Sequence, residues 1–359
     1  MRCEPARGPI AKSTIAVWRV VAAGGDCYAY CMVAAGHVEL VIAAGDKRVH
    51  AAAMGDADEL RLAPGRDNLQ ERVTFLSDGL KLSGVVHVPD GLNAGERCPA
   101  IIMMHGFGAN KNGGPEWVCK QFESWGYVAL RFDYRGCGES EGERGRVIPM
   151  EEVSDARNAV TYLAARAEVD PDRVALCGSS LGAGVAVYAA GIDPRVAAVI
   201  LENGLGNGER IIRSMHTPES WNKFLQLMDD GIRHREQTGT SKMVHRFEIF
   251  EMPKELQKNL TSNNSLMHFT AETAVGFFMF RPEELIGKIA PRPILILHSA
   301  RDRVCRFEEA FSMARLANPP FELHLLDGTD HFMFVDTHPG VAATLRNWLD
   351  RYFPVRAAT

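Results

Sequence analysis

The chain has 359 residues, of which 46% are hydrophobic and 24% are charged, and its formal net charge is −5. This composition is ordinary for a globular protein and excludes a disordered, collagen-like or coiled-coil chain. The small acidic excess also argues against a protein that follows nucleic-acid phosphates, because such a protein needs a basic surface.

The eight cysteines are scattered and form neither a C-x-x-C pair nor a cluster at zinc spacing, so we expect reduced thiols and no metal site. No uncharged apolar run reaches the roughly 18 residues of a membrane span. The apolar segment 15–23 is interrupted by Arg19 and is followed by Gly24-Gly25-Asp26 rather than by a cleavage site. We therefore expect a cytoplasmic protein without a secretory signal.

The first predicted elements are two antiparallel strands, 72–75 and 81–88, joined by a turn at Ser77-Asp78-Gly79. Six short runs that are apolar almost throughout follow them: 99–104, 127–132, 173–177, 196–201, 293–298 and 321–326. Runs of this kind are typical of strands buried on both faces of a parallel sheet.

Four segments with helical periodicity lie between or after these runs: 150–166, 181–190, 306–317 and 341–352. The alternation predicts an α/β fold with a mostly parallel sheet, flanking helices and right-handed crossovers. Ligands of such sheets bind beyond the carboxyl ends of the strands, so the loops there are candidate site elements.

The interval from Gly204 to Ala290 departs from this alternation of strands and helices, because it is helical in tendency, rich in Met and Phe, and shows no clear strand. We expect residues 205–290 to form a helical lid or cap between two parts of the core, 71–204 and 291–355. The simpler alternative is that its apolar residues form only the core of a helical subdomain. Residues 1–70 are predicted to be an N-terminal extension.

The central motif is Gly178-Ser179-Ser180-Leu181-Gly182, a G-x-S-x-G pattern between a predicted strand and a predicted helix. A nucleophile at such a corner has crowded backbone angles, which glycines two positions before and after it relieve. The start of the helix also directs N–H groups towards the reacting centre. Ser180 is therefore the candidate nucleophile; Ser179 lacks the flanking glycines, and a plain serine turn is the alternative.

A serine hydroxyl needs a base, and the base needs an orienting carboxylate. In sheets of this class the chain order is Ser, acid, His. His331 follows the last predicted strand and Asp302 follows the preceding one, so they are the predicted base and acid. Glu202 and Asp330 are rival carboxylates.

Acyl transfer also needs donors for the developing oxyanion, usually two backbone N–H groups. Leu181, directly after the candidate nucleophile, is one predicted donor. The second is Phe107 in His105-Gly106-Phe107-Gly108, where Gly106 and Gly108 let the backbone approach closely. The alternative is an ordinary glycine-rich turn.

These motifs, with Asp133-Tyr134-Arg135-Gly136-Cys137-Gly138-Glu139-Ser140, resemble the α/β-hydrolase superfamily over about residues 72–355. The resemblance is closest to the serine aminopeptidase-like and dienelactone hydrolase-like esterase branch. It implies hydrolysis of an ester, thioester or amide through an acyl-serine intermediate, without a cofactor. It also implies supporting roles for His105, Gly106, Gly178 and Gly182.

Residues 24–43 are similar to a fragment of inositol monophosphatase-type phosphatases. The family's metal-binding Asp would fall near His50, so the resemblance implies no phosphatase activity. We expect a remnant of a gene fusion or a docked accessory segment, followed by a polar linker at 55–71.

The predicted substrate is a small carboxylic ester with an apolar acyl or aryl group. A peptidase and a carbon–carbon bond hydrolase on the same triad are alternatives, as is a non-catalytic binding protein. A dipeptidyl peptidase would need carboxylates for a free amine, and the candidates are Glu251, Glu255, Glu272, Glu283 and Glu284. A dehalogenase would need Asp in place of Ser180. The sequence leaves a homodimer open.

Overall fold

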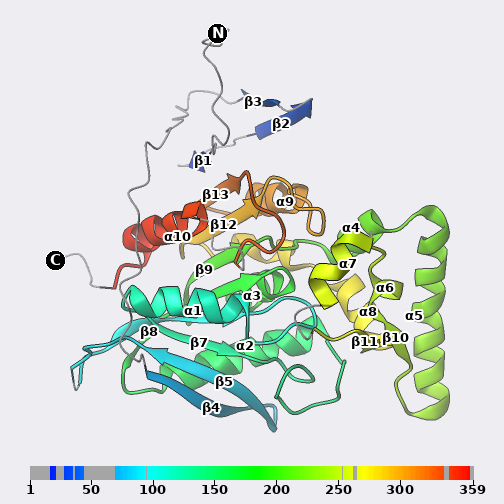
Figure 1. The fold of residues 1–359 in the computed structure, drawn as a ribbon, viewed down its shortest axis with the longest axis horizontal. Coiled ribbons are helices and arrows are strands. Elements are labelled where there is room, and N and C mark those ends of the chain that lie inside the picture. Colours follow the sequence, from blue (N-terminus) through cyan, green and yellow to red (C-terminus); the bar gives the residue numbers. More distant parts are fainter. Residues whose placement is uncertain are drawn as a thin grey trace.

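The structure is a computed structural model. It describes residues 17–21, 28–34, 37–43, 69–93, 95–252, 254–261, 265–334 and 339–355. A nine-stranded sheet forms its centre, in the order β1-β13-β12-β9-β8-β6-β7-β5-β4 (Figure 1). Its strands are β1 (Val17–Val21), β4 (Leu69–Ser77), β5 (Leu80–Val88), β6 (Cys98–Met104), β7 (Val128–Phe132), β8 (Val169–Ser179), β9 (Val196–Glu202), β12 (Ile294–Ser299) and β13 (Phe321–Leu326).

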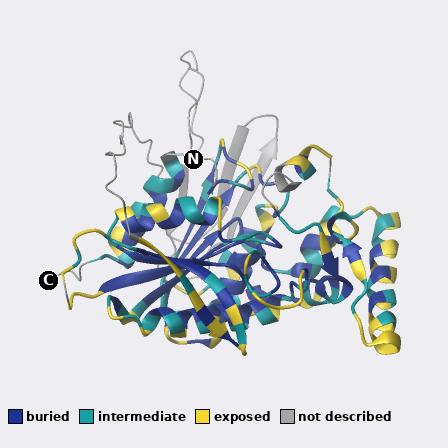
Figure 2. Ribbon diagram, turned by 60° about the horizontal axis from the view of Figure 1, so that its bottom comes forward, coloured by how far each residue is buried: buried dark blue, intermediate teal, exposed yellow. Residues whose placement is uncertain are grey.

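The six strands from β13 to β7 are parallel to their neighbours, whereas β5, β4 and β1 join the sheet in antiparallel pairs. This confirms the predicted α/β class and each of the six apolar strands. The parallel strands are buried on both faces (Figure 2), which explains why their sequences do not alternate between polar and apolar residues.

Helices cover both faces of the sheet. Successive residues of β6 point to opposite sides, so Ile101 and Met103 belong to one apolar core and Ile102 and Met104 to the other. The first core is closed by α1 (Gly114–Ser124) and α10 (Pro339–Tyr352). The second is closed by α2 (Pro149–Ala164), α3 (Leu181–Ile192) and α9 (Glu308–Leu316).

Helix α1 is not among the elements predicted from the sequence. It begins at Gly114 and Pro115, and its N-cap residue, Gly113, has φ 77° and offers no side chain to cap the first turn. The capping signal that announces most helices is therefore missing. Val118, Cys119 and Phe122 nevertheless give the helix a buried face against the sheet.

Residues 205–290, here called the helical insertion, connect β9 to β12 and lie at one end of the molecule (Figure 1). The insertion contains α4 (Gly208–Met215), α5 (Pro218–Thr238), α6 (Arg246–Ile249), α7 (Lys254–Thr261), α8 (Ala271–Met279) and two short 3₁₀ turns. It also contains two strands, β10 (Met243–His245) and β11 (His268–Thr270), which pair antiparallel. The expectation of a segment without strands is therefore wrong at this point.

The N-terminal region differs from its predicted description at two places. Strand β1 pairs with β13, so this part of the extension adds to the central sheet. Strand β4 begins at Leu69, so residues 69–71 belong to the sheet and not to a linker. Strands β2 (Tyr28–Ala34) and β3 (His37–Ala43) form a separate hairpin. His50 lies outside the described residues, as does the predicted linker apart from residues 69–71.

Within the part of the chain that the structure describes, no helix is both long enough and apolar enough to cross a membrane.

Candidate active site

Ser180 lies at a sharp corner between β8 and α3, with φ 56° and ψ −116°. A Cβ atom on Gly178 would lie 2.2 Å from the carbonyl oxygen of Gly182. A Cβ atom on Gly182 would lie 2.6 Å from the carbonyl oxygens of Met104 and His105. Both distances are impossible for a real side chain, so only glycine at both positions allows Ser180 to take this conformation.

Three side chains from different loops form a hydrogen-bonded series. The Oγ atom of Ser180 lies 3.1 Å from Nε2 of His331, and Nδ1 of His331 lies 2.7 Å from Oδ2 of Asp302. Asp302 follows β12 and His331 follows β13, so the carboxyl ends of three parallel strands bring the series together. The second oxygen of Asp302 accepts the backbone N–H groups of Val304 and Cys305 at 2.7 and 2.9 Å, which fixes the orientation of the carboxylate.

The surroundings of His331 favour one protonation pattern. Burial lowers the pKa of the imidazole, but the adjacent Asp302 carboxylate, with smaller contributions from Glu202 and Asp330, more than offsets this effect, so the pKa is raised above its ordinary 6.5. The same carboxylate accepts the proton on Nδ1. In the neutral ring, Nε2 is therefore free to accept the hydroxyl proton of Ser180.

The loop after β6 lies directly against Ser180. A Cβ atom on Gly106 would approach the Cβ atom of Ser180 to 3.2 Å, so glycine permits this close packing. The carbonyl oxygen of Gly106 accepts Nδ1–H of His105 at 2.9 Å and the N–H of Ala109 at 3.1 Å. Burial lowers the pKa of His105, which keeps the ring neutral. Neither Phe107 N–H nor Leu181 N–H donates to another described residue.

Glu202 is the last residue of β9 and Asn203 follows it, and the carbonyl oxygen of Glu202 accepts the N–H of Ser180 at 2.9 Å. Burial raises the pKa of Glu202 to about 8, although His331, Ser179 and Asn203 offset part of the effect. The carboxyl group is therefore neutral at pH 7, and Asp302, not Glu202, is the carboxyl group bonded to His331. Asn203 has φ 45° and donates from Nδ2 to Glu202 and to the carbonyl oxygen of Asp330, both at 3.0 Å.

A buried thiol also adjoins the serine. The Sγ atom of Cys305 lies 3.9 Å from Oγ of Ser180, and burial raises the pKa of this thiol well above its usual range. Cys305 is therefore protonated and is a poor nucleophile. His298, neutral because burial lowers its pKa, donates from Nε2 to the carbonyl oxygen of Cys305 at 2.7 Å and so steadies the loop that carries Asp302.

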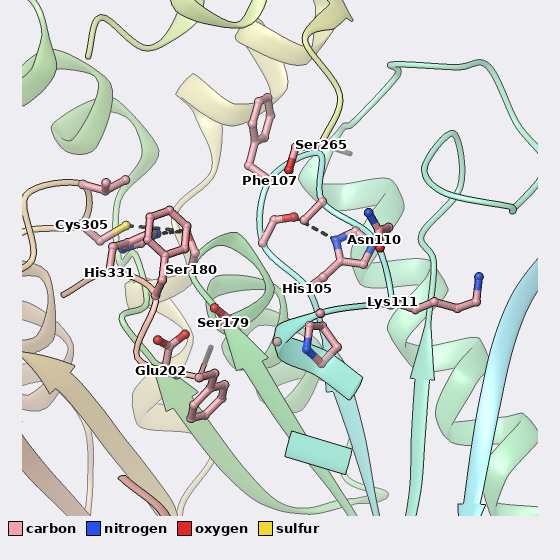
Figure 3. A pocket seen from close by; sticks show the side chains of 18 of the residues that line it. His105, Phe107, Asn110, Lys111, Ser179, Ser180, Glu202, Ser265, Cys305 and His331 are labelled. Atoms are coloured by element: carbon pink, nitrogen blue, oxygen red, sulfur yellow. Dashed lines mark hydrogen bonds between the residues drawn. The ribbon is translucent and has the colours of Figure 1, made fainter. Parts of the chain in front are cut away.

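A pocket of about 520 Å³ opens above Ser180 and His331. Figure 3 shows Ser180, His331 and Cys305 grouped on one side of it and Asn110 and Lys111 on the other. The side chains around the serine are mainly apolar and come from both the core and the helical insertion: Leu205, Ile211, Met215, Phe250, Met252, Phe277, Val304, Phe332 and Phe334. At the far side, Lys111 is bound by Asp133 and Glu139, so its charge is compensated.

Only some of the Met and Phe residues of the insertion lie on this pocket. Met215, Phe250 and Phe277 line it, together with Met252. Trp221, Phe224 and Phe278 instead form an aromatic cluster within the insertion, and Met243 and Met279 are exposed. Some of the apolar residues of the insertion therefore line the pocket, whereas others pack against one another within the insertion.

The five glutamates considered for binding a free amine do not line the pocket. Glu283 is paired with Arg210, and Glu255 is paired with Arg303. Among the described residues, no cluster of three or more His, Cys, Asp or Glu side chains is arranged to hold a metal ion.

Sequence reasoning missed the contributions of Asn203, Cys305 and Arg246 to this site. Asn203 carried a signal, because asparagine directly after a strand is suited to positive φ. Arg246, a buried residue of the insertion that lines the pocket, carried none, because its placement depends on how the short elements there pack.

The comparisons with known proteins agree with this geometry. The family model for serine aminopeptidase, S33, matches residues 95–338, more than half of the chain. The chain is 28% identical over 280 residues to thiohydrolase aneE of Aspergillus aculeatus, covering 72% of this chain and 85% of that protein. It is 27% identical over 289 residues to polyketide transferase ATR5 of Stachybotrys chlorohalonatus, covering 76% and 93%.

Among solved structures, the α/β hydrolase GrgF from Penicillium sp. superimposes with a TM-score of 0.68 at 24% identity, covering 79% of this chain and 99% of that one. The matching family model begins at residue 95, so the resemblance of residues 24–43 to phosphatases finds no support there. The extent of the family match and the shared fold establish that this chain belongs to the serine aminopeptidase S33 family of α/β hydrolases.

Proposed function

We propose that the protein is a serine hydrolase that cleaves a carboxylic ester or thioester with an apolar acyl group through an acyl-Ser180 intermediate. The observation that carries this proposal is the hydrogen-bonded series from Ser180 through His331 to Asp302 at a glycine-flanked corner. The N–H groups of Phe107 and Leu181, which donate to no other described residue, would stabilise the negative charge that develops on the carbonyl oxygen.

In the first half of the reaction, Oγ of Ser180 attacks the carbonyl carbon while Nε2 of His331 takes the hydroxyl proton. Asp302 accepts Nδ1–H and stabilises the imidazolium that forms. Phe107 N–H and Leu181 N–H donate to the oxyanion, and each such donor is worth about 3 kcal/mol. Collapse of the tetrahedral intermediate expels the alcohol or thiolate, and His331 returns the proton to the leaving group.

In the second half, a water molecule gives its proton to Nε2 of His331 and adds to the acyl carbon. The intermediate collapses, the proton passes to Oγ of Ser180, and the carboxylic acid leaves. The helical insertion acts as the lid in this scheme, because Met215, Phe250 and Phe277 cover the pocket with apolar surface.

An ester or thioester suits the pocket better than a peptide with a free N-terminus. The acidic residues on the pocket wall are Asp133, Glu139 and Glu202. The first two are bound to Lys111, and the third is neutral at pH 7 because burial raises its pKa to about 8. No carboxylate among the described lining residues is therefore left to bind an α-ammonium group. The name of the thiohydrolase relative favours a thioester as one substrate class.

A fluorophosphonate label tests the chemistry, and paired panels of p-nitrophenyl esters and N-acetylcysteamine thioesters of increasing acyl length test the substrate class. Wild type should be labelled, and S180A should lose the label and at least about 10³-fold of turnover without unfolding. The neighbouring variant S179A is the matched control and should keep the label. An S180A protein that retains more than about a tenth of the wild-type rate would refute the assignment.

A further inference from the structure

Arg246 begins α6 in the helical insertion and lines the pocket, yet its side chain is buried. It makes no ion pair with a carboxylate of the described residues, and Nε has no acceptor there. Burial lowers the pKa of the guanidinium only to about 10, so the group is charged at neutral pH. A buried cation without a counter-ion is costly, which indicates that the contacts it makes matter.

Those contacts hold the loop that carries Phe107. Nη2 of Arg246 donates to the carbonyl oxygen of Phe107 at 2.8 Å, and Nη1 donates to the carbonyl oxygen of Leu266 at 3.0 Å. The guanidinium also lies over the ring of Phe107, 5.2 Å from its centroid, and over that of Phe269 at 5.8 Å. Arg246 therefore joins the insertion to the loop that carries Phe107.

The two peptide groups that flank Phe107 are thus fixed by different parts of the fold. The peptide that carries Phe107 N–H has its oxygen on Gly106, which His105 and Ala109 hold. The next peptide has its oxygen on Phe107, which Arg246 holds. Because the N–H and C=O of one peptide point in opposite directions, the contacts to the Gly106 oxygen set the direction of Phe107 N–H. The bond from Arg246 restrains the next peptide, so the backbone cannot rotate at Phe107 and let the first peptide turn away.

Further contacts attach the same loop to the insertion. Leu266 N–H donates to the carbonyl oxygen of Gly108 at 2.7 Å, and the ring of Phe269 stacks on Phe107 with centroids 4.4 Å apart. Gly108 has φ 57°, and a Cβ atom there would lie 2.5 Å from the Phe269 ring. In Figure 3, Ser265, which precedes this contact segment, lies beside Phe107 at the pocket.

We propose that Arg246 is a positioning residue that aims the N–H of Phe107 at the oxyanion by holding the following carbonyl group. The proposal rests on the function proposed above and makes the oxyanion site a joint product of the core and the helical insertion. Arg246 does not touch the reacting atoms in this scheme.

The test compares R246M and R246K with R235M, a matched change at an exposed arginine elsewhere in the insertion that pairs with Glu272. R246M should lower kcat by about 10- to 100-fold and change KM by less than about threefold, because a misdirected donor weakens the transition state more than the ground state. The kcat of R246K should fall nearly as far, since one ammonium group cannot bridge the carbonyl oxygens of both Phe107 and Leu266. R235M should stay within about twofold.

Two readouts separate positioning from a general loss of structure. Affinity for an alkyl trifluoromethyl ketone, which forms a tetrahedral oxyanion on the serine, should fall by the same factor as kcat/KM. Amide hydrogen exchange over residues 105–110 should speed up in R246M and R246K but not in R235M, while thermal melting shows that each variant is folded.

Unchanged kcat and unchanged exchange in R246M would overturn the proposal. Full activity in R246K would overturn it too, because the charge alone would then suffice. A loss confined to esters with a carboxylate on the acyl chain would show that Arg246 binds an anionic substrate instead. If wild type hydrolyses neither esters nor thioesters, the proposed function fails, and the exchange measurement alone decides whether Arg246 orders the loop.

Discussion

The side-chain amide of Asn203 donates a 3.0 Å hydrogen bond to the carbonyl oxygen of Asp330, the residue directly before His331. The oxygen of the same amide accepts the N–H of Ser299 at 2.7 Å. One side chain at the end of β9 thus ties the loop that carries His331 to the end of β12. We expect the position of the imidazole to depend on these two hydrogen bonds, although Asn203 is not a member of the series that joins Ser180, His331 and Asp302.

Replacing Asn203 tests this tie. N203G removes the side chain but suits the positive φ of 45°, so it should lose about 1–3 kcal/mol of unfolding free energy from the polar groups left unpaired. N203A should lose about 1 kcal/mol more, because alanine is strained at this φ. Urea unfolding measures both, and ester turnover should fall about tenfold in each. An N203G protein with wild-type stability and turnover would show that the tie is unimportant.

The pH profile of turnover tests the partnership of Asp302 with His331. Since the carboxylate raises the pKa of His331 above 6.5, and the base must be neutral, the acidic limb of kcat/KM in wild type should lie above pH 6.5. D302N removes the largest of the effects that raise the pKa of His331, so the acidic limb should move to lower pH while the rate falls about 10³- to 10⁴-fold.

The control for this experiment is D330N, which changes an exposed carboxylate one residue before the imidazole. The acidic limb of the D330N profile should move only slightly to lower pH, because Asp330 contributes least of the carboxylates that raise the pKa of His331. A D330N profile displaced as far as that of D302N would contradict the assignment of Asp302.

The raised pKa of Glu202 predicts how the stability of the protein depends on pH. Its folded-state pKa of about 8 lies above the ordinary 4.5, so the folded protein holds a proton that the unfolded chain releases between these pH values. The unfolding free energy of wild type should therefore fall by about 1.4 kcal/mol per pH unit from this group as pH rises from 4.5 to 8, with no penalty below 4.5.

Glutamine does not titrate, so E202Q escapes this loss of stability. It should be more stable than wild type by about 3 kcal/mol at pH 7, with little difference at pH 4.5. Denaturant titrations of both proteins at several pH values measure the difference. Because Glu202 is neutral at pH 7, turnover there should change less than about threefold. A stability difference that does not grow with pH would show that Glu202 is ionised in the folded protein.

The pocket-lining role of the insertion can be tested at two adjacent phenylalanines. Phe277 lines the pocket, whereas Phe278 packs against Trp221 and Phe224 away from it. F277L should cost about 1–2 kcal/mol of stability and shift the preferred acyl group towards longer or bulkier chains. F278L should leave the chain-length profile unchanged, and equal shifts in both variants would contradict this description of the pocket.

Parts of the fold with a strong local sequence pattern could be predicted from the sequence, and parts without one could not. The six strands around the site are buried on both faces, so runs such as 99–104 and 293–298 are unmistakable. Their alternation with helices confirms the α/β class and leads directly to the loops of Ser180, Asp302 and His331, which the structure then brings together.

The insertion shows where such prediction ends. Strands β10 and β11 have three residues each, too few for a periodic pattern to emerge. The place of Arg246 beside Phe107 is set by long-range packing between segments 139 residues apart. Strand β1 likewise depends on an edge of the sheet that only the folded core provides.

The backbone of Ser180, with φ 56° and ψ −116°, lies in a region that non-glycine residues occupy at a cost of about 1–3 kcal/mol. Glycine at this position would relieve that strain, so S180G should melt at a higher temperature than wild type while turning over no substrate. Residue 180 is thus the point at which thermal tolerance and turnover oppose each other, and a screen that selects for heat resistance alone would favour inactive proteins.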